Sequence, residues 1–240
     1  MISEERIIME AKLSNIEKKI GVTFKNKDLL QQAFVHRSYL NENKDFRLDH
    51  NERLEFLGDA CLELIVTDYL YNNFPNPEGE LTNWRAALVR GAMISQIAKK
   101  LGYEDYLLLS RGEAKSTGRA RELILANTFE AVLGAVYLDK GYKAADKLVK
   151  KHLLPRLPEI LDKKLYNDPK SMFQEVVQEK TGITPVYKLE HEEGPDHAKV
   201  FTMAVFVGEK RITEGKGYSK QIAEQEAAQK AIEIWAETLE

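Results

Sequence analysis

The sequence predicts a protein of two domains, an all-α bundle over residues 1–155 and a smaller α+β domain over residues 168–240. In the first region, helix-forming residues dominate and apolar residues recur three and four positions apart, without a run of strict alternation. After a seam with prolines at positions 155, 158 and 169, the pattern changes to short runs rich in β-forming residues. We expect residues 156–167 of this seam to form a linker.

Composition limits the class of protein. The chain has 240 residues, of which 43% are hydrophobic, so it can bury a substantial core. Its single cysteine, Cys61, excludes a disulfide scaffold and a zinc site of several cysteines. No apolar run approaches the roughly 20 residues of a membrane span, and the first residues show no signal peptide. These features predict a soluble, cytoplasmic protein without a membrane partner. The net charge is −3, and residues 168–240 alone carry −5, which argues against indiscriminate binding of polyanions.

Breaks that contain Gly, Pro or Asn divide the first region into roughly seven or more predicted helices. The second region predicts the order α-β-β-β-α. Pro169 opens its first helix, which carries an apolar stripe through Phe173 and Val177 and ends at Gly182. Strands are predicted at Val186–His191, Lys199–Val207 and Arg211–Gly217. Ser219 is a suitable N-cap for a closing helix that continues to about Trp235.

Residues 51–60, Asn-Glu-Arg-Leu-Glu-Phe-Leu-Gly-Asp-Ala, give the strongest functional signal. At about 100° per residue, Glu52, Glu55 and Asp59 lie within an arc of about 60° on a helix. Apolar residues on the same helix predict a buried face, consisting of Leu54, Leu57, Cys61 and Leu64. Acids this close together repel, and partial burial penalises their ionised forms, so a bound cation would relieve both costs.

A second predicted helix places a polar pair, Asn127 and Glu130, in apolar surroundings. Oxygen ligands without cysteine or clustered histidine suit Mg²⁺ or Mn²⁺ better than zinc. The alternative is that the acids are solvated, or paired with Arg53 and Arg121, as most isolated acidic pairs are. The density of acids within apolar helices favours the metal site.

The segment at 51–60 resembles the signature of the ribonuclease III family almost letter for letter, and the resemblance extends over essentially the whole chain. In the first region it includes His36-Arg37-Ser38-Tyr39 with Asn41-Glu42, Glu78-Gly79-Glu80-Leu81, and the helix with Asn127 and Glu130. In the second region the sequences DPKSMFQE at 168–175 and GPDHAKVF at 194–201 resemble the family's double-stranded RNA-binding domain. The motifs occur in the family's order.

The resemblance implies a helical endonuclease domain of the ribonuclease III type, followed by a double-stranded RNA-binding domain. It implies a homodimer that hydrolyses double-stranded RNA and leaves 5′-phosphate and 3′-hydroxyl ends with two-nucleotide 3′ overhangs. The implied cofactor is Mg²⁺, for which Mn²⁺ can substitute, with two ions in each site. Ribosomal RNA precursors and other structured RNAs are the implied substrates.

The resemblance also assigns roles to single residues. The family's metal ligands fall on Glu55, Asp59 and Glu130, with position 127 as the fourth. Glu52 and Glu78 match acids that line the same site, and we expect them to place water and RNA. With Glu52, the three acidic ligands make up the expected catalytic residues. Phe56 matches an aromatic side chain that inserts into the partner subunit.

Position 127 departs from the family, which has Asp where this chain has Asn. The amide oxygen can still bind a hard cation, but it brings no charge. Three explanations stay open: the site tolerates a neutral ligand with weaker metal affinity, the activity is reduced, or the residue was engineered. A duplex-binding protein that has lost cleavage is therefore the main rival function. A helical scaffold that only dimerises would explain neither the acids nor the second domain.

The second domain is expected to read duplex RNA through its shape, its phosphates and its 2′-hydroxyls. One face of its first helix carries the polar residues Ser171, Gln174, Glu175 and Gln178, which by resemblance face the minor groove. His197 matches a second minor-groove contact, and Lys220 matches a phosphate contact at the start of the last helix. The family has two or three basic residues there, whereas Gln221 and Ile222 follow Lys220 here. We therefore expect modest affinity from each such domain.

Two further features do not by themselves indicate a function. His36 and Ser38 lack an acid that would complete a catalytic triad, which favours a packing or capping role. The loop around 112–118 has four basic residues nearby, Arg111, Lys115, Arg119 and Arg121. Simple solvation and contact with the RNA backbone explain these residues equally well.

Overall fold

The computed structural model describes residues 4–166, 168–195 and 199–237. The chain divides into two compact units, Met1–Tyr166 and Asn167–Glu240. Among the described residues, no helix is long and apolar enough to cross a membrane.

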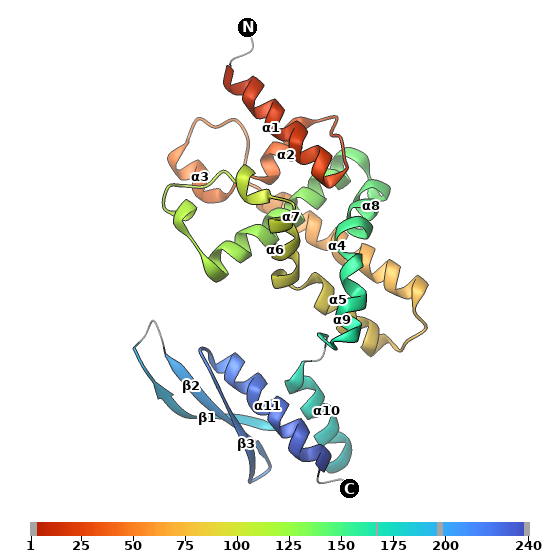
Figure 1. Cartoon of the computed structure of the whole chain (residues 1–240), viewed down its shortest axis with the longest axis vertical. Helices are drawn as coiled ribbons and strands as arrows, with labels where there is room; N and C mark the ends of the chain where they lie inside the picture. The colour runs from red at the N-terminus through yellow and green to blue at the C-terminus, as the bar shows by residue number, and fades with distance from the viewer. Residues whose placement is uncertain (1–3, 167, 196–198, 238–240) are drawn as a thin grey trace. The chain divides into compact units, whose positions relative to one another are not determined.

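The first unit is built from α-helices joined by short connections (Figure 1). Its α-helices are α1 (Glu4–Ile20), α2 (Lys27–Ala33), α3 (Arg37–Glu42), α4 (Glu52–Asn73), α5 (Glu78–Val89), α6 (Gly91–Lys100), α7 (Gly118–Lys140), α8 (Tyr142–His152) and α9 (Leu157–Asp162). Three 3₁₀ helices lie between them, η1 (Tyr103–Tyr106), η2 (Glu113–Lys115) and η3 (Leu154–Arg156). The only β-type pairing in the described part of this unit is an isolated parallel bridge between Val35 and Leu108.

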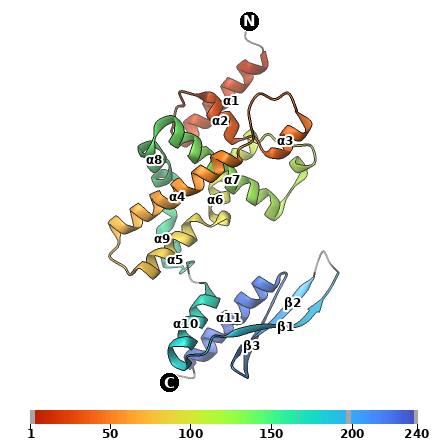
Figure 2. The same ribbon diagram turned by 180° about the vertical axis from the view of Figure 1, so that it is seen from behind.

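Helices α4 and α7 cross in the middle of this unit, and Figure 2 shows the crossing. Glycines allow their backbones to touch. A Cβ atom on Gly58 would lie 1.8 Å from the carbonyl oxygen of Glu130, and a Cβ atom on Gly134 would lie 2.2 Å from the carbonyl oxygen of Leu54. Either contact is far shorter than the optimal separation of about 3.5 Å between non-bonded carbon atoms. The acids one turn away on each helix are therefore brought close together.

The buried face of α4 differs in part from the predicted one. Leu54 and Cys61 are buried as predicted, and burial raises the pKa of the Cys61 thiol. Leu64, however, is 59% exposed. The core-facing side continues instead through Leu62 and Ile65, which are both fully buried. Apolar residues occur on nearly every side of this helix, so their spacing alone does not decide which side packs inward.

Asp139, near the end of α7, fixes the entry into α2. Its carboxylate accepts hydrogen bonds from the backbone N–H groups of Lys25 and Asn26, both at 2.8 Å. Burial acts to raise the pKa of this carboxyl. The two N–H groups and the neighbouring Lys140 outweigh that effect and lower the pKa below its ordinary value.

Tyr103 lies at the centre of an aromatic cluster. Its ring contacts Phe34 edge-on at 5.3 Å between centroids and stacks on Phe129 at 6.3 Å. The side chain is fully buried, and its hydroxyl has no hydrogen-bond partner among the described residues. Burial raises the pKa of this hydroxyl strongly.

The expected linker at 156–167 is largely part of the first unit, which corrects the prediction. Leu157 and Ile160 of α9 are buried in the helical core. The prolines at 155 and 158, which indicated a break, stand in the first turns of η3 and α9. Proline is tolerated there because the first N–H groups of a helix have no partner within it.

The second unit has the predicted order α-β-β-β-α. Its elements are α10 (Pro169–Thr181), β1 (Val186–Glu193), β2 (Val200–Val207), β3 (Lys210–Gly217) and α11 (Lys220–Glu237). The sheet is antiparallel with strand order β1-β2-β3. Figures 1 and 2 show α10 and α11 side by side on one face of it. The core between the layers consists of Phe173, Val177, Val205, Val207, Ala227, Ala228 and Ala231.

Candidate active site

The start of α4 is anchored by the first residue of the signature. Asn51 is buried; its backbone N–H donates to the carbonyl of Val35 at 2.9 Å, and its side-chain amide donates to the carbonyl of Ala33 at 3.0 Å. These bonds join α4 to the end of α2 and fix the direction in which the helix begins. The acids in the following two turns are therefore held by the core rather than by a loop.

The structure brings together four of the predicted site residues, Glu55 and Asp59 from α4 and Asn127 and Glu130 from α7. Glu55 and Glu130 are partly buried, and Asp59 is exposed. Burial, followed by the charges of Asp59 and Glu55, raises the pKa of Glu130 to about 7. Burial also raises the pKa of Glu55, with further contributions from Glu52 and Asp59. The acids of the two helices are thus close enough to repel one another.

Asn127 contacts this group directly. Its side-chain amide lies close enough to Glu55 to oppose the rise in the pKa of that carboxyl. An amide has an N–H₂ group to donate, whereas an ionised carboxylate has none. Asn127 therefore stabilises the charged form of Glu55 in a way that Asp could not.

The ion pairs around these acids differ from the alternative in which the acids pair with Arg53 and Arg121. Glu52 is exposed and lies 3.5 Å from Arg37 and 3.7 Å from the Nδ1 of His50. Arg121 does not pair with an acid among the residues that the structure describes. Its guanidinium donates to backbone carbonyl groups, at 3.2 Å to Ser116 and at 2.7 Å to Ala114.

The donor chemistry of this group fits a hard divalent cation. Glu55, Asp59 and Glu130 supply carboxylate oxygens, Asn127 supplies an amide oxygen, and such oxygens are what Mg²⁺ and Ca²⁺ bind. Within the described part of the chain, no three His, Cys, Asp or Glu side chains are already arranged to hold a metal ion. The residues fit the ion by chemistry and mutual proximity.

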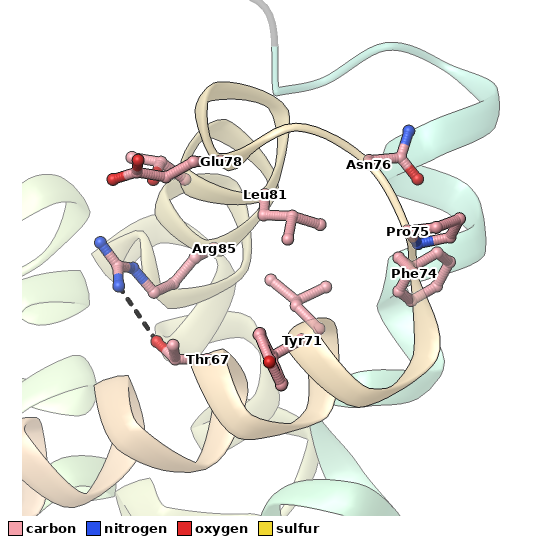
Figure 3. A pocket seen from close by; sticks show the side chains of 10 residues that line it. Thr67, Tyr71, Phe74, Pro75, Asn76, Glu78, Leu81 and Arg85 are labelled. Carbon is pink, nitrogen blue, oxygen red and sulfur yellow. Dashed lines mark hydrogen bonds between the residues drawn. The ribbon is translucent and has the colours of Figure 1, made fainter.

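Glu78 lies elsewhere. It stands in the first turn of α5 and lines a cleft of about 560 Å³ between α5 and the second half of α4 (Figure 3). Its neighbours in this cleft include Thr67, Tyr71 and Arg85. Glu55 and Thr67 are twelve residues apart on α4, which is about 18 Å along the axis. Within one chain, Glu78 therefore does not join the acids around Glu130, contrary to the expectation that it lines the same site.

Large apolar side chains form an exposed stripe on α4. Phe56, Leu64 and Tyr71 are 81%, 59% and 78% exposed. Their spacing places them within an arc of about 80° on the helix. Phe56 is not part of the core of its own chain.

The structure places four of the predicted RNA-contacting residues of the second unit on one exposed face of α10. Ser171, Gln174, Glu175 and Gln178 are all exposed, opposite the buried Phe173 and Val177. Ser171 and Gln174 line a polar cleft of about 300 Å³ together with Gln221 of α11, a residue that sequence reasoning did not assign. Lys220 is exposed, with its amine 5.9 Å from the centre of the Phe201 ring. His197 lies outside the described residues.

The motif at residues 36–42 has a structural role and not a nucleophilic one. Ser38 and Glu42 instead accept backbone hydrogen bonds from Ser110 and Arg111. The sequence did not predict these contacts, although the motif at 36–42 marked the segment as part of the family resemblance.

Both units of the chain resemble known proteins. Residues 26–157 match the family described as Ribonuclease-III-like, and residues 169–234 match the double-stranded RNA binding motif. Ribonuclease 3 of Streptococcus thermophilus is 44% identical over 220 residues, which cover 91% of this chain and 95% of that protein. Ribonuclease 3 of Borreliella afzelii is 45% identical over 224 residues, which cover 93% of this chain and 91% of that protein.

The fold agrees as well. A solved structure of the nuclease domain of ribonuclease III from Campylobacter jejuni matches with a TM-score of 0.54 and 35% identity, over 60% of this chain and 97% of that chain. It is described as showing flexibility in a region involved in dimer formation. These matches confirm the family and the fold class predicted from the sequence. The chain therefore belongs to the ribonuclease III family, and it is an endoribonuclease of double-stranded RNA with its own double-stranded RNA-binding domain.

Proposed function

We propose that the chain cleaves double-stranded RNA by metal-dependent hydrolysis at the crossing of α4 and α7. Glu55, Asp59 and Glu130 are the charged metal ligands in this proposal, and Asn127 is a neutral one. The observation that carries it is the meeting of these groups where two helix backbones touch, with the pKa of Glu130 raised to about 7 by burial and by the other acids. Such mutual repulsion is costly in an empty site and is relieved by a bound cation.

Bound divalent ions, Mg²⁺ or Mn²⁺ and two in each site, would activate water and neutralise charge on the phosphate and on the leaving oxygen. The chain's own residues hold and orient this chemistry. Glu55 and Glu130 stand on rigid helices that are fixed by core packing, and Glu52 lies at the rim, where it is paired with Arg37. We infer that Glu52 orients water or RNA at the edge of the site.

Glu130→Gln tests this assignment. The substitution keeps the size of the side chain but removes a charged ligand, so we expect cleavage to be abolished, whereas duplex binding in Ca²⁺ survives because it depends mainly on the second unit. Glu122→Gln, an exposed acid on the same helix, is the matched control and should cleave normally. Equal loss of binding and cleavage in Glu130→Gln would contradict the assignment.

A duplex-binding protein without cleavage is the second candidate, and Asn127 is the observation that favours it. Incubation of the purified protein with a duplex RNA and Mg²⁺, followed by gel electrophoresis, separates the two functions. The first proposal includes products with 5′-phosphate and 3′-hydroxyl ends and two-nucleotide 3′ overhangs. It also includes ribosomal RNA precursors and other structured RNAs in the cytoplasm as substrates.

We propose that both units contact the RNA. In the second unit, the polar face of α10, His197 and Lys220 contact the duplex. In the first unit, the exposed cations Arg111 and Lys115 contact phosphates, since neither side chain forms an ion pair with a described residue. Glu78, which lines a cleft of its own, is assigned to RNA contact and not to the metal site of its own chain.

We propose a homodimer that forms through the exposed stripe of Phe56, Leu64 and Tyr71 on α4. Large apolar side chains that are exposed along one side of a helix suit an interaction surface, and such a stripe can pair with its own copy about a two-fold axis. Phe56→Ala should raise the dimer dissociation constant, because truncating a buried interface aromatic often costs about 2 kcal/mol or more. Leu123→Ala, 63% exposed on α7, is the control. An unchanged dimer in sedimentation would show that Phe56 does not lie in the interface.

A further inference from the structure

Helix α3 and the residue before it are joined to the segment that begins at Leu108. His36 donates its backbone N–H to the carbonyl of Leu108 at 3.0 Å. Ser38 accepts the N–H of Ser110 on its hydroxyl oxygen at 3.1 Å, and the carboxylate of Glu42 accepts the N–H of Arg111 at 3.1 Å. The last two bonds depend on side chains of α3. We call Ser38 and Glu42 the α3 clamp.

The segment held by the clamp is also fixed internally and at its far end. Ser110 accepts the N–H of Glu113 on its hydroxyl at 3.1 Å. At the other end, Arg121 in the first turns of α7 donates to the carbonyls of Ser116 and Ala114. Residues 110–116 are therefore tied to α3 on one side and to the active-site helix α7 on the other.

This segment presents cations to solvent. Arg111 and Lys115 are exposed, and neither forms an ion pair with a described residue, although many other charged residues of the chain do. Asn127 lies six residues beyond Arg121 on α7, about 9 Å along the helix axis. The cations thus belong to a segment that hydrogen bonds connect to the helix that carries Asn127 and Glu130.

The clamp contributes little to the core. No residue of α3 is buried, and Glu42 is itself exposed. An acid on a surface that receives RNA is unfavourable by simple electrostatics, because it repels phosphate. This repulsion is offset because Glu42 orders the backbone of Arg111. A loose segment would lose conformational entropy when RNA binds, and an ordered one does not.

We propose that Ser38 and Glu42 are positioning residues for RNA cleavage: they hold residues 110–116 in place so that Arg111 and Lys115 meet phosphates of the duplex beside α7. The inference rests on the proposed function of the chain as a nuclease that contacts RNA through these cations. Ser38 and Glu42 act through the backbone of the segment, and no described contact joins them to Glu55, Asp59 or Glu130.

The direction in which Glu42→Ala changes the KM for duplex RNA tests the proposal. Glu42→Ala removes a negative charge, which by electrostatics alone would lower the KM for duplex RNA. If the clamp acts as proposed, the KM rises instead, on the order of fivefold, with kcat changed less than about twofold, because the loosened segment must be ordered by RNA. Glu42→Gln keeps an acceptor oxygen and should restore most of the wild-type KM. Asp45→Ala removes the same charge from an exposed position outside the clamp and should not raise the KM.

A double-mutant cycle in the full-length protein identifies the path. Arg111→Ala keeps the backbone N–H that Glu42 holds, so combining it with Lys115→Ala removes the cations and leaves the clamp intact. In that background Glu42→Ala should raise the KM no further. Hydrogen exchange of peptides that cover 108–118 should be faster in Glu42→Ala and unchanged in the variant without the cations.

Two results would overturn the proposal: an equal rise in KM with and without the cations, or faster exchange in Glu42→Ala with an unchanged KM. Absence of cleavage by the unaltered protein would refute the proposed function itself. In that case, duplex affinity in Ca²⁺ replaces the KM in the same cycle, and a clamp without effect on affinity is refuted as well.

Discussion

A methyl group at the α4–α7 crossing should damage both stability and cleavage. Gly134→Ala would place its Cβ atom 2.2 Å from the carbonyl oxygen of Leu54, and 3.1 Å from the backbone nitrogen of Gly58. To restore a normal separation of about 3.5 Å, the helices must move apart by roughly 1 Å. The atoms in the way are backbone atoms, so no side chain can rotate to make room.

The two energetic effects oppose each other. Alanine inside a helix is favoured over glycine by about 1 kcal/mol, whereas overpacking of a closely packed core costs about 1–3 kcal/mol, and occasionally more. Because this contact is backbone against backbone, we place the cost at the upper end and expect a net loss of about 1–2 kcal/mol. A shift of about 1 Å between Glu55 and Glu130 should also lower kcat on the order of 100-fold.

Urea denaturation and single-turnover cleavage in saturating Mg²⁺ measure the two effects. Gly79→Ala is the control for stability, because a Cβ atom at Gly79 in the first turn of α5 meets no atom within 4 Å. It should be neutral or slightly stabilising. If Gly134→Ala keeps the wild-type midpoint and cleaves within about twofold of the wild-type rate, the close helix crossing does not position the acids, and the reasoning fails.

Four further outcomes follow from single groups. Asn127→Asp adds a charge beside Glu55 and removes a donor, so Mg²⁺-supported cleavage should rise, and the melting temperature without metal should fall; an unchanged or lower rate would mean that the site is adapted to the amide. The pKa of Asp139 is lower in the folded state than in the unfolded state, so this carboxylate stabilises the fold above its unfolded pKa and loses that effect as the pH falls through its folded pKa. The difference in unfolding free energy between wild type and Asp139→Asn should therefore shrink below about pH 4. Gln221→Lys should tighten duplex binding and steepen the plot of log affinity against log salt by about 0.9, and an unchanged slope would show that residue 221 does not meet a phosphate. Tyr103→Phe removes a buried hydroxyl without a described partner and should stabilise the protein by about 1 kcal/mol in urea denaturation, whereas a clear loss would reveal a bound water.

The sequence was sufficient to locate the acids, because helical spacing places Glu52, Glu55 and Asp59 on one side of α4 whatever the helix packs against. It was also sufficient for the order of the second unit, since alternation and turn residues are local signals. Neither signal depends on a distant partner.

The remaining features depend on tertiary partners. The exposure of Leu64 could not be read from spacing, because it depends on where α7 lies. The separation of Glu78 from the other acids follows from the length of α4, which carries the start of α5 far from Glu55. The role of Glu42 could not be read either, because its partner lies 69 positions further along the chain. In each case the deciding contact links segments that are distant in sequence.

The buried thiol of Cys61 can report local opening of the first unit through its reaction with a labelling reagent. It is the one cysteine of the sequence, and it lies on α4 within the helical core, two residues beyond Asp59. A thiol-labelling reagent can react only when this part of the first unit opens, because the side chain is buried and its thiolate form is disfavoured. Labelling rates in native buffer therefore convert to the free energy of a local opening event. Their change on adding a divalent cation would measure how strongly the ion closes the helix pair, without any substitution and without RNA.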